Sequence, residues 1–258
     1  MSLDDFSMDF FSLKGKTAIV TGGNSGLGLA FSTALAKAGA HLFIPSYVMD
    51  DGKAAKLIEK QGNGLELMEI DITHDGAPKK IIETCVRKFG SVDILVNNAG
   101  ISKLNSVLEF GRKDWDPMIA VNLTAAFELS HEAAKIMIPQ KSGKMINICS
   151  LFSYLGGQWS SAYAATKHGI AGLTKAYCDE LAQYNIQVNG IAPGYYATEL
   201  TTETRSDPEK NQRVLDHIPT NRWGELQDLM GTAVFLASRA SDYVNGHVLV
   251  VDGGYLVR

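Results

Sequence analysis

A glycine-rich turn near the amino terminus constrains the fold of this chain more than any other feature. The apolar run Thr17–Val20 leads directly into Thr21-Gly-Gly-Asn-Ser-Gly-Leu-Gly28, and apolar residues at helical spacing continue from there to Ala38. Glycine permits the tight backbone turn that joins a strand to a helix at close range. The segment therefore predicts a strand, a turn and a helix that open a βαβ unit.

The rest of the chain repeats this alternation of short apolar runs and longer amphipathic stretches. Six further runs have the near-continuous apolar character of strands covered on both faces, and these are His41–Ile44, Leu65–Ile70, Ile94–Val96, Met145–Cys149, Ile186–Ile191 and Val248–Val251. Helical patterns separate them, and we expect Asp114 to be the N-cap of a long helix with Pro117 in its first turn. The order predicts an α/β fold: a single-domain, Rossmann-type, doubly wound parallel sheet of about seven strands over residues 1–258.

Two segments fall outside the alternation. Residues 1–12 contain Phe6, Phe10 and Phe11, which predict a short N-terminal arm lying on the domain. Residues 195–219 are polar and helix-prone and contain no strand. Long insertions of this kind often cover a binding site, so we expect a substrate lid before the last helix and strand.

Composition excludes several classes of protein. A net charge of −4 without a basic run disfavours nucleic-acid and anionic-membrane partners. Cys85, Cys149 and Cys178 are too scattered for a disulfide framework or a zinc site, and no metal site is expected. No apolar stretch has the length of a membrane helix, and the amino terminus lacks the basic region of a signal peptide. We therefore expect a cytoplasmic protein.

The glycine turn also predicts a ligand. Its backbone can approach a pyrophosphate closely, and the helix that follows supplies N–H groups and the positive end of its dipole. The residues expected to bind a dinucleotide here are Thr21, Gly22, Asn24, Ser25, Gly26, Leu27 and Gly28. In a doubly wound fold such a ligand lies at the carboxyl ends of the strands.

A second group of residues predicts proton transfer. Tyr163 and Lys167 are four residues apart and share one face of a helix. A nearby ammonium or helix amino terminus favours the phenolate form of a tyrosine. Tyr163 could then donate a proton to a carbonyl oxygen while a hydride arrives, or remove one from an alcohol. Ser150 would hydrogen-bond the same oxygen, and Ser153 is a rival for this role.

Together these motifs resemble the short-chain dehydrogenase/reductase family. The matching features are the Thr-Gly-x-x-x-Gly-x-Gly turn, Asn97-Asn-Ala-Gly100, Tyr163-x-x-x-Lys167, Pro193-Gly194 and Asp252-Gly-Gly254, which cover nearly the whole chain. The resemblance implies a catalytic set of Asn122, Ser150, Tyr163 and Lys167. Its spacing selects Ser150 over Ser153, whose hydroxyl is expected to cap the loop or line the pocket. The resemblance assigns Lys167 to the nicotinamide ribose and Asn122 to a water relay for protons.

The same resemblance implies further contacts with a nicotinamide cofactor. Asp71 would meet the adenine and Thr198 the nicotinamide amide. Beyond the glycine turn, the cofactor residues implied are Ser46, Asp71, Ile72, Asn98, Ala99, Gly100, Tyr163, Lys167, Pro193, Gly194 and Thr198.

The end of the second strand distinguishes the two nicotinamide cofactors. An acidic residue there binds the ribose hydroxyl of NAD, and an arginine accepts the phosphate of NADP. Ser46 and Tyr47 are neither, and Ser25 stands where family members that use NADP often have a basic residue. Asp50 and Asp51 add negative charge that would repel a phosphate. We therefore expect NAD(H) to be preferred, with NADP(H) left open.

Segments of the second half resemble the sugar-acid dehydrogenases of this family. These are Ile191–Thr198, Ile218–Gly224, Asp228–Gly231 and Val234–Ser238, which match the 2-dehydro-3-deoxy-D-gluconate 5-dehydrogenase (2-deoxy-D-gluconate 3-dehydrogenase) and gluconate 5-dehydrogenase types. Ser206–Lys210 favours the gluconate type. The resemblance implies an NAD(H)-dependent oxidoreductase that interconverts a secondary alcohol and a ketone on a sugar acid.

A sugar-acid carboxylate requires a cation or several hydrogen-bond donors. Lys103 and Arg205 are the candidates, although each could equally be a solvated surface charge. Trp159 stands where relatives of the deoxygluconate type tend to carry arginine, and it could stack on a sugar or pack at a subunit contact. Together with Ser150 and Tyr163, these make up the expected substrate residues.

Two other functions remain open at this point. A reductase of acyl thioesters or other small carbonyls could use the same scaffold, but residues 201–216 are dense in charged and hydroxyl groups rather than apolar. A nucleotide-sensing protein without catalysis is also compatible with the fold, although the complete catalytic set argues against it. The family resemblance further implies a homotetramer or a dimer.

Overall fold

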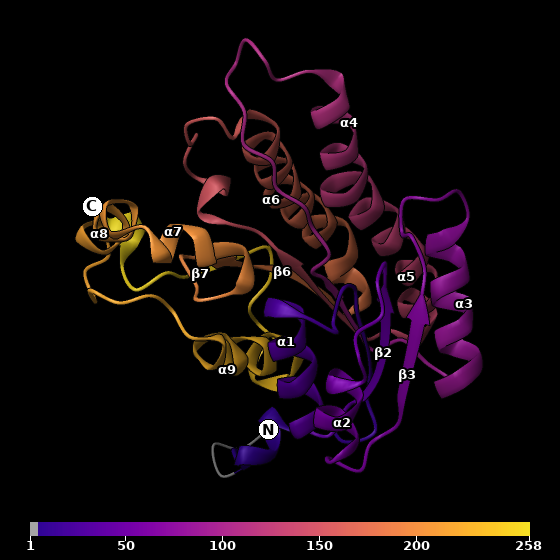
Figure 1. The fold of residues 1–258 in the computed structure, drawn as a ribbon. Helices are drawn as coiled ribbons and strands as arrows, with labels where there is room; N and C mark the ends of the chain where they lie inside the picture. The colour runs from indigo at the N-terminus through magenta and orange to yellow at the C-terminus, as the bar shows by residue number, and fades with distance from the viewer. Residues whose placement is uncertain (1–4) are drawn as a thin grey trace.

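Seven parallel strands form one sheet within residues 5–258, the part of the chain that this computed structural model describes (Figure 1). The strands are β1 (Thr17–Val20), β2 (His41–Ser46), β3 (Leu65–Glu69), β4 (Ile94–Asn97), β5 (Gly143–Ile148), β6 (Ile186–Pro193) and β7 (Val248–Val251). Their order is β3-β2-β1-β4-β5-β6-β7, so the direction of winding reverses between β1 and β4. The predicted doubly wound sheet is confirmed, and its ligand crevice is expected at this reversal.

Helices cover both faces of the sheet, and apolar residues from each layer form the core. One face packs against α1 (Gly26–Lys37), α2 (Lys53–Glu59) and α9 (Leu226–Ala237). The other packs against α3 (Ala77–Phe89), α5 (Ala125–Gln140) and α6 (Ser161–Leu181). The shorter α4 (Arg112–Ile119) precedes α5. Burial of both faces explains why the strands are apolar along their whole length.

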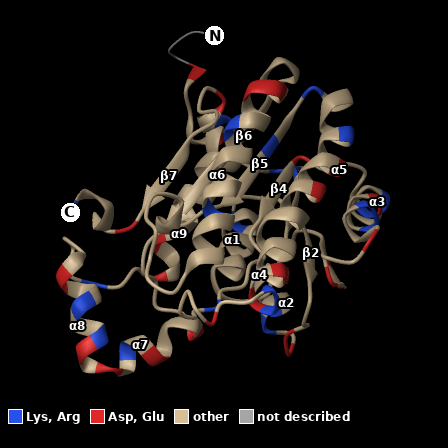
Figure 2. Ribbon diagram, turned by 90° about the horizontal axis from the view of Figure 1, so that it is seen from above, with Lys and Arg blue, Asp and Glu red and all other residues tan. Residues whose placement is uncertain are grey.

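Short helices form most of the segment predicted as an insertion. Between β6 and α9 the chain forms η6 (Glu199–Thr201), α7 (Thr202–Ser206) and α8 (Pro208–His217). In Figure 1 these helices lie beside β7 and the carboxyl terminus. Figure 2 shows both signs of charge along α7 and α8, which agrees with the polar character of the sequence there.

The described part of the amino-terminal arm packs on the short helix that follows α9. Residues 1–4 of the predicted arm lie outside the described residues. Met8–Phe11 forms the short helix η2, and the Arg239 guanidinium lies 4.8 Å from the centre of the Phe10 ring. A cation–π contact therefore attaches this segment to η7 (Arg239–Ser241).

The prediction that Asp114 caps a helix is wrong. Helix α4 begins at Arg112 with Gly111 as its N-cap, so Asp114 lies inside the first turn. Its carboxylate accepts hydrogen bonds from the Lys103 ammonium and from the Asn105 amide, and the residue is only 3% exposed. The carboxylate is occupied by groups of the preceding loop rather than by the helix N–H groups.

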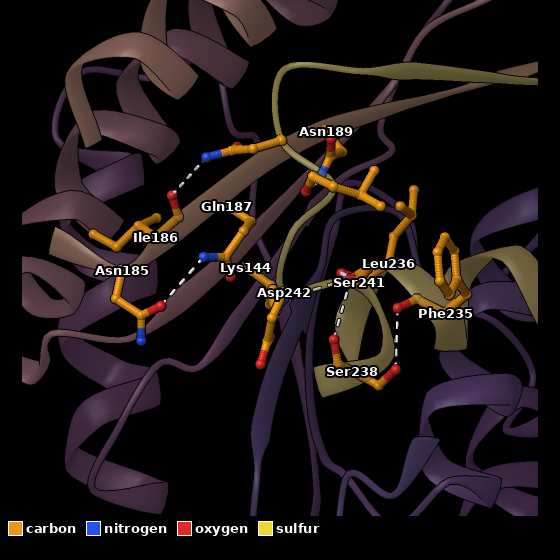
Figure 3. A network of polar contacts seen from close by, with 12 residues as sticks. Lys144, Asn185, Ile186, Gln187, Asn189, Phe235, Leu236, Ser238, Ser241 and Asp242 are labelled. Atoms are coloured by element: carbon orange, nitrogen blue, oxygen red, sulfur yellow. Dashed lines mark hydrogen bonds and ion pairs between the residues drawn. The ribbon is translucent and has the colours of Figure 1, made fainter. Parts of the chain in front are cut away.

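A buried lysine anchors the amino end of β5 (Figure 3). Lys144 is 9% exposed, and its ammonium donates to the Asp242 carboxylate at 2.8 Å and to the Ser241 hydroxyl at 3.4 Å. Burial lowers the pKa of Lys144, and the Asp242 carboxylate opposes that shift. The network joins η7, after the end of α9, to the sheet.

Two properties of residues 5–258 bear on the class of protein. No helix there is both long and apolar enough to cross a membrane. No group of three or more histidine, cysteine or acidic side chains in the same range could hold a metal ion.

Candidate active site

The carboxyl ends of the central strands open into a cavity of about 780 Å³. It lies at the reversal of strand order, where a doubly wound sheet places its ligand. Most of the residues predicted for cofactor binding or catalysis line it: Gly22, Asn24, Ser25, Gly26, Leu27, Gly28, Ser46, Asp71, Ile72, Asn98, Ala99, Gly100, Ser150, Tyr163, Lys167, Pro193 and Gly194. Thr21, Asn122 and Thr198 lie outside this lining.

The glycine turn has the geometry that a pyrophosphate requires. Gly22 has a φ of 62°, and a Cβ placed on Gly28 would lie 2.2 Å from the carbonyl oxygen of Gly22. Helix α1 starts at Gly26, and its N-cap Ser25 makes no side-chain capping bond. The first N–H groups of α1 therefore remain available at the cavity, where they can bind an anion.

The Asn-Ala-Gly segment after β4 fixes this turn from the other side. The Asn98 amide donates to the Thr21 carbonyl at 2.8 Å. The Thr21 hydroxyl accepts from the N–H groups of Asn98 and Ala99, at 3.0 and 2.9 Å. Thr21 is buried, so it positions the cradle rather than touching a ligand.

The ends of β2 and β3 line the opposite end of the cavity. The Ser46 hydroxyl donates to Asn24 Oδ1 at 2.9 Å, and the Asn24 amide donates to the Val48 carbonyl at 2.7 Å. Asp71 accepts from the hydroxyl and the N–H of Thr73, and these two hydrogen bonds lower the pKa of its carboxyl. Asp71 is therefore a carboxylate at neutral pH, able to accept a hydrogen bond from an amine.

Two serines after β5 have different partners. Ser150 is the N-cap of the short helix η4 (Leu151–Ser153), and its hydroxyl oxygen accepts from the Phe152 N–H at 3.2 Å. Ser153 donates its hydroxyl hydrogen to the Lys167 carbonyl at 2.7 Å and accepts from the Ser150 N–H. Ser150 lines the cavity with its hydroxyl hydrogen free to donate, whereas the hydrogen of Ser153 is used within the protein.

Tyr163 and Lys167 lie on one face of α6, as their spacing predicts. The Lys167 ammonium lies 5.5 Å from the centre of the Tyr163 ring and donates to the Ile148 carbonyl at 2.6 Å. The Tyr163 ring also makes an edge contact with Phe152 at 5.7 Å. A phenol, a hydroxyl donor and an ammonium thus meet at the same wall of the cavity.

Asn122 lies in a π-helical turn, Ala120–Thr124, between α4 and α5. Its side chain accepts from the Ile101 N–H at 2.8 Å and donates to the Ile101 carbonyl at 2.9 Å and to Thr166 at 3.2 Å. These bonds join the loop after Gly100 to α6. Single π-turns are frequent at functional sites, and the helical periodicity of the sequence gave no sign of this one.

The three predicted substrate residues outside the catalytic set are not among the residues that line the cavity. Lys103 pairs with Asp114. Arg205 donates to the Thr198 carbonyl at 3.0 Å, and Trp159 is 61% exposed with a φ of 60°. Among the residues that line the cavity, Lys167 is the single cation.

Sequence reasoning missed part of the lining. The missed residues include Pro45, Val48, Ile70, Ile101, Ser102, Pro117, Val121 and Leu200. Several of them lie at or one to three residues beyond strand ends, and that position could have identified them. Leu200 could not be found this way, because the chain folds it to the cavity through η6.

Comparison with known proteins agrees with this geometry. A family model described as enoyl-(acyl carrier protein) reductase matches residues 22–256. The uncharacterized oxidoreductase YgcW of Escherichia coli (strain K12) is 77% identical over 100% of this chain and 98% of its own length. A 2-dehydro-3-deoxy-D-gluconate 5-dehydrogenase of Bacillus subtilis (strain 168) is 45% identical over 97% of this chain and 98% of its own.

A solved structure extends the comparison to the fold. The crystal structure of a gluconate 5-dehydrogenase from Burkholderia cenocepacia J2315, in complex with NADP and tartrate, is 38% identical with a TM-score of 0.91. The match covers 97% of this chain and 98% of that one.

The doubly wound sheet and these matches define an oxidoreductase. The chain belongs to the short-chain dehydrogenase/reductase family, as its motifs predicted. The family uses NAD(P), and the expected preference for NAD(H) finds no support in the Burkholderia structure, which holds NADP.

Proposed function

We propose that this chain interconverts a secondary alcohol and a ketone on a sugar acid, with Tyr163 as the general acid and base. One observation carries the proposal: the glycine turn and the Ser150, Tyr163 and Lys167 side chains line the same cavity. A dinucleotide bound at the turn and a substrate oxygen beside Tyr163 would then share one cavity. The cofactor, when bound, supplies or accepts the hydride.

Each catalytic side chain has a separate task. Ser150 accepts from Phe152 and keeps its hydroxyl hydrogen for the substrate oxygen. Tyr163 gives a proton to that oxygen in reduction and takes one in oxidation. Lys167 uses one of its three hydrogens on Ile148, so the others are free for hydroxyl groups of the cofactor. Asn122 holds the loop after Gly100 against α6, which supports its proposed place in the proton relay.

The sugar-acid substrate is supported by two relatives, one named for 2-dehydro-3-deoxy-D-gluconate and one for gluconate. We assign residues 195–219 as the lid, because Leu200 lines the cavity although it is 94% exposed. Arg205 lies on this segment, and its bonds to Thr198, Thr201 and Thr202 use only Nε and Nη2. Nη1 is therefore available for a substrate carboxylate. Lys103 and Trp159 are proposed to border the substrate at the rim.

The preference for NAD(H) remains a proposal that rests on the chain's own residues. The cavity lining at the end of β2 consists of Pro45, Ser46, Tyr47 and Val48, and it includes no lysine or arginine that could bind a phosphate. Asp50 and Asp51 follow directly. The comparison of kcat/KM for NADH and NADPH decides the point: a larger value with NADPH would contradict the preference.

We also propose a homotetramer or dimer. Phe127 on α5 is half exposed, and its ring stacks with His131 and with Tyr177 of α6. An exposed aromatic group across two helices is the kind of surface that a second copy covers. Light scattering on the purified protein tests this, and a monomer would contradict it.

The decisive experiment follows the absorbance of the reduced nicotinamide with NADH and with NADPH. The acceptors are 5-keto-D-gluconate, 2,5-diketo-3-deoxygluconate and an acetoacetyl thioester. We expect rapid oxidation of the reduced cofactor with one of the two keto sugar acids, and the one that reacts identifies the substrate type. Turnover with the thioester alone would replace the sugar acid by an acyl substrate, and turnover with none of them would contradict the proposal.

A further inference from the structure

Phe152 contacts both of the residues proposed to hold the substrate oxygen. Its N–H donates to the Ser150 hydroxyl oxygen at 3.2 Å. Its ring lies 5.7 Å from the Tyr163 ring, centre to centre, with the two planes at 82°. This edge-to-face arrangement is one that aromatic pairs favour. One residue therefore connects the loop after β5 to the first turn of α6.

Gly157 holds the Phe152 ring from the same loop. A Cβ placed on Gly157 would lie 2.1 Å from Cε1 and 2.7 Å from Cδ1 of Phe152. No larger residue fits there unless the ring moves. Gly157 also has a φ of 80°, which favours glycine. The Phe152 ring thus has a fixed neighbour in addition to Tyr163.

Tyr163 depends on such packing for its orientation. Across residues 5–258 its hydroxyl oxygen has no hydrogen-bond partner. Its ring contacts the Phe152 ring and the Lys167 ammonium. The direction of the phenol is therefore set by the groups that touch its ring.

We propose that Phe152 is a positioning residue for the reaction: its N–H orients the Ser150 hydroxyl, and its ring sets the Tyr163 phenol. The proposal rests on the proposed function of Tyr163. Phe152 itself does not line the cavity, so it acts through Ser150 and Tyr163 rather than on the substrate. The Phe152 N–H occupies one lone pair of the Ser150 hydroxyl, and the Phe152 ring fixes the direction of the Tyr163 phenol. In this arrangement both hydroxyl groups can hydrogen-bond the same substrate oxygen.

The first test is Phe152→Leu, which keeps the backbone N–H and the apolar volume but removes the ring. We expect kcat for 5-keto-D-gluconate or 2,5-diketo-3-deoxygluconate to fall about 10- to 100-fold, because small misplacements of catalytic groups cost this much. The dissociation constant of the cofactor should stay unchanged. Phe89→Leu is the matched control, since Phe89 is also half buried and stacks on His41, at 5.5 Å, outside the cavity lining. Equal effects of the two substitutions on kcat would overturn the proposal.

The second test approaches the same ring from Gly157. Gly157→Ala introduces the Cβ that meets Phe152, while Gly62→Ala has a similar backbone cost, with φ values of 80° and 76°, and meets no atom within 4 Å. We expect both to lose stability and only Gly157→Ala to lose kcat at unchanged cofactor affinity. Equal kcat in the two variants would contradict the role of the ring.

A crystal structure of Phe152→Leu gives a result that does not require turnover. We expect the Tyr163 side chain to change its orientation relative to the wild-type protein. An unmoved Tyr163 would overturn the positioning role even if the substrate assays fail, whereas an active Tyr163→Phe variant would overturn the proposed function itself. The two failures can therefore be told apart.

Discussion

Two buried lysines lie at opposite ends of strand β5, and their ammonium groups have different hydrogen-bond partners. At the amino end, Lys144 donates to the Asp242 carboxylate, so its charge is compensated within the protein. At the carboxyl end, Lys167 donates to the neutral Ile148 carbonyl. Among the described residues no carboxylate pairs with Lys167. Burying a lysine without an acidic partner costs free energy, and such groups are found most often at functional sites. The contrast therefore distinguishes a structural end of the sheet from the end proposed to be functional.

The largest expected effect concerns Lys167. Lys167→Met should lower kcat/KM about 10³-fold, within the range of general acid–base catalysis, and should weaken cofactor binding. Steady-state kinetics and cofactor titration measure both. Lys144→Met is the matched control, because it removes an equally buried ammonium at the other end of β5. Comparable losses of activity in the two variants would contradict the different roles assigned to Lys167 and Lys144.

Ser150→Ala is expected to have the next largest effect. Loss of a hydrogen bond to the reacting oxygen should lower kcat about 10²-fold. Ser153→Ala should lower kcat less and the melting temperature more, since Ser153 joins η4 to the Lys167 carbonyl. If Ser153→Ala were the less active variant, the roles of the two serines would have to be exchanged.

At the amino end we expect an effect on stability only. Asp242→Ala leaves the Lys144 ammonium buried without its partner and should cost about 1–2 kcal/mol, reduced from the fully buried case because Asp242 is half exposed. Lys144→Met should cost less, since a buried apolar group needs no partner. Urea unfolding of both variants gives the comparison. The reverse order would contradict this account of the pair.

The smallest effect concerns the Lys103–Asp114 pair. The hydrogen bond from Lys103 holds the pKa of Asp114 below its usual value. The ion pair therefore stabilises the folded protein at pH values above the pKa of Asp114 in the unfolded chain, about 4. This stabilisation is lost as the pH falls through the pKa of Asp114 in the folded protein. The free-energy difference between wild type and Asp114→Asn should be largest near neutral pH and shrink in acid. A difference independent of pH, measured by urea unfolding, would contradict it.

The sequence predicted what depends on local pattern. Continuous apolar runs located every strand, and β1 and β7 have the predicted bounds. The glycine turn and the Tyr163–Lys167 spacing placed the cavity, because parallel strands bring their carboxyl ends to one edge. These features are determined by residues close together in the chain.

Features that depend on distant partners could not be predicted. From the sequence Asp114 is predicted to be a helix cap. In the folded protein the preceding loop places Lys103 at its carboxylate instead. The π-turn around Asn122 follows from its bonds to Ile101 and Thr166, which helical periodicity does not reveal. The contact between Phe152 and Tyr163 requires two elements to pack, so neither residue alone indicates it.

The most direct test of the central claim is the substitution Tyr163→Phe. It removes the phenol oxygen and keeps the ring that packs on Phe152, so folding and cofactor affinity should match the wild type. The measurement is the rate at which the reduced cofactor is oxidised with the keto sugar acid that the wild-type protein reduces. The cofactor is titrated against the same sample. We predict a loss of at least about 10³-fold with unchanged cofactor binding. Turnover near the wild-type rate would contradict Tyr163 as the acid and base.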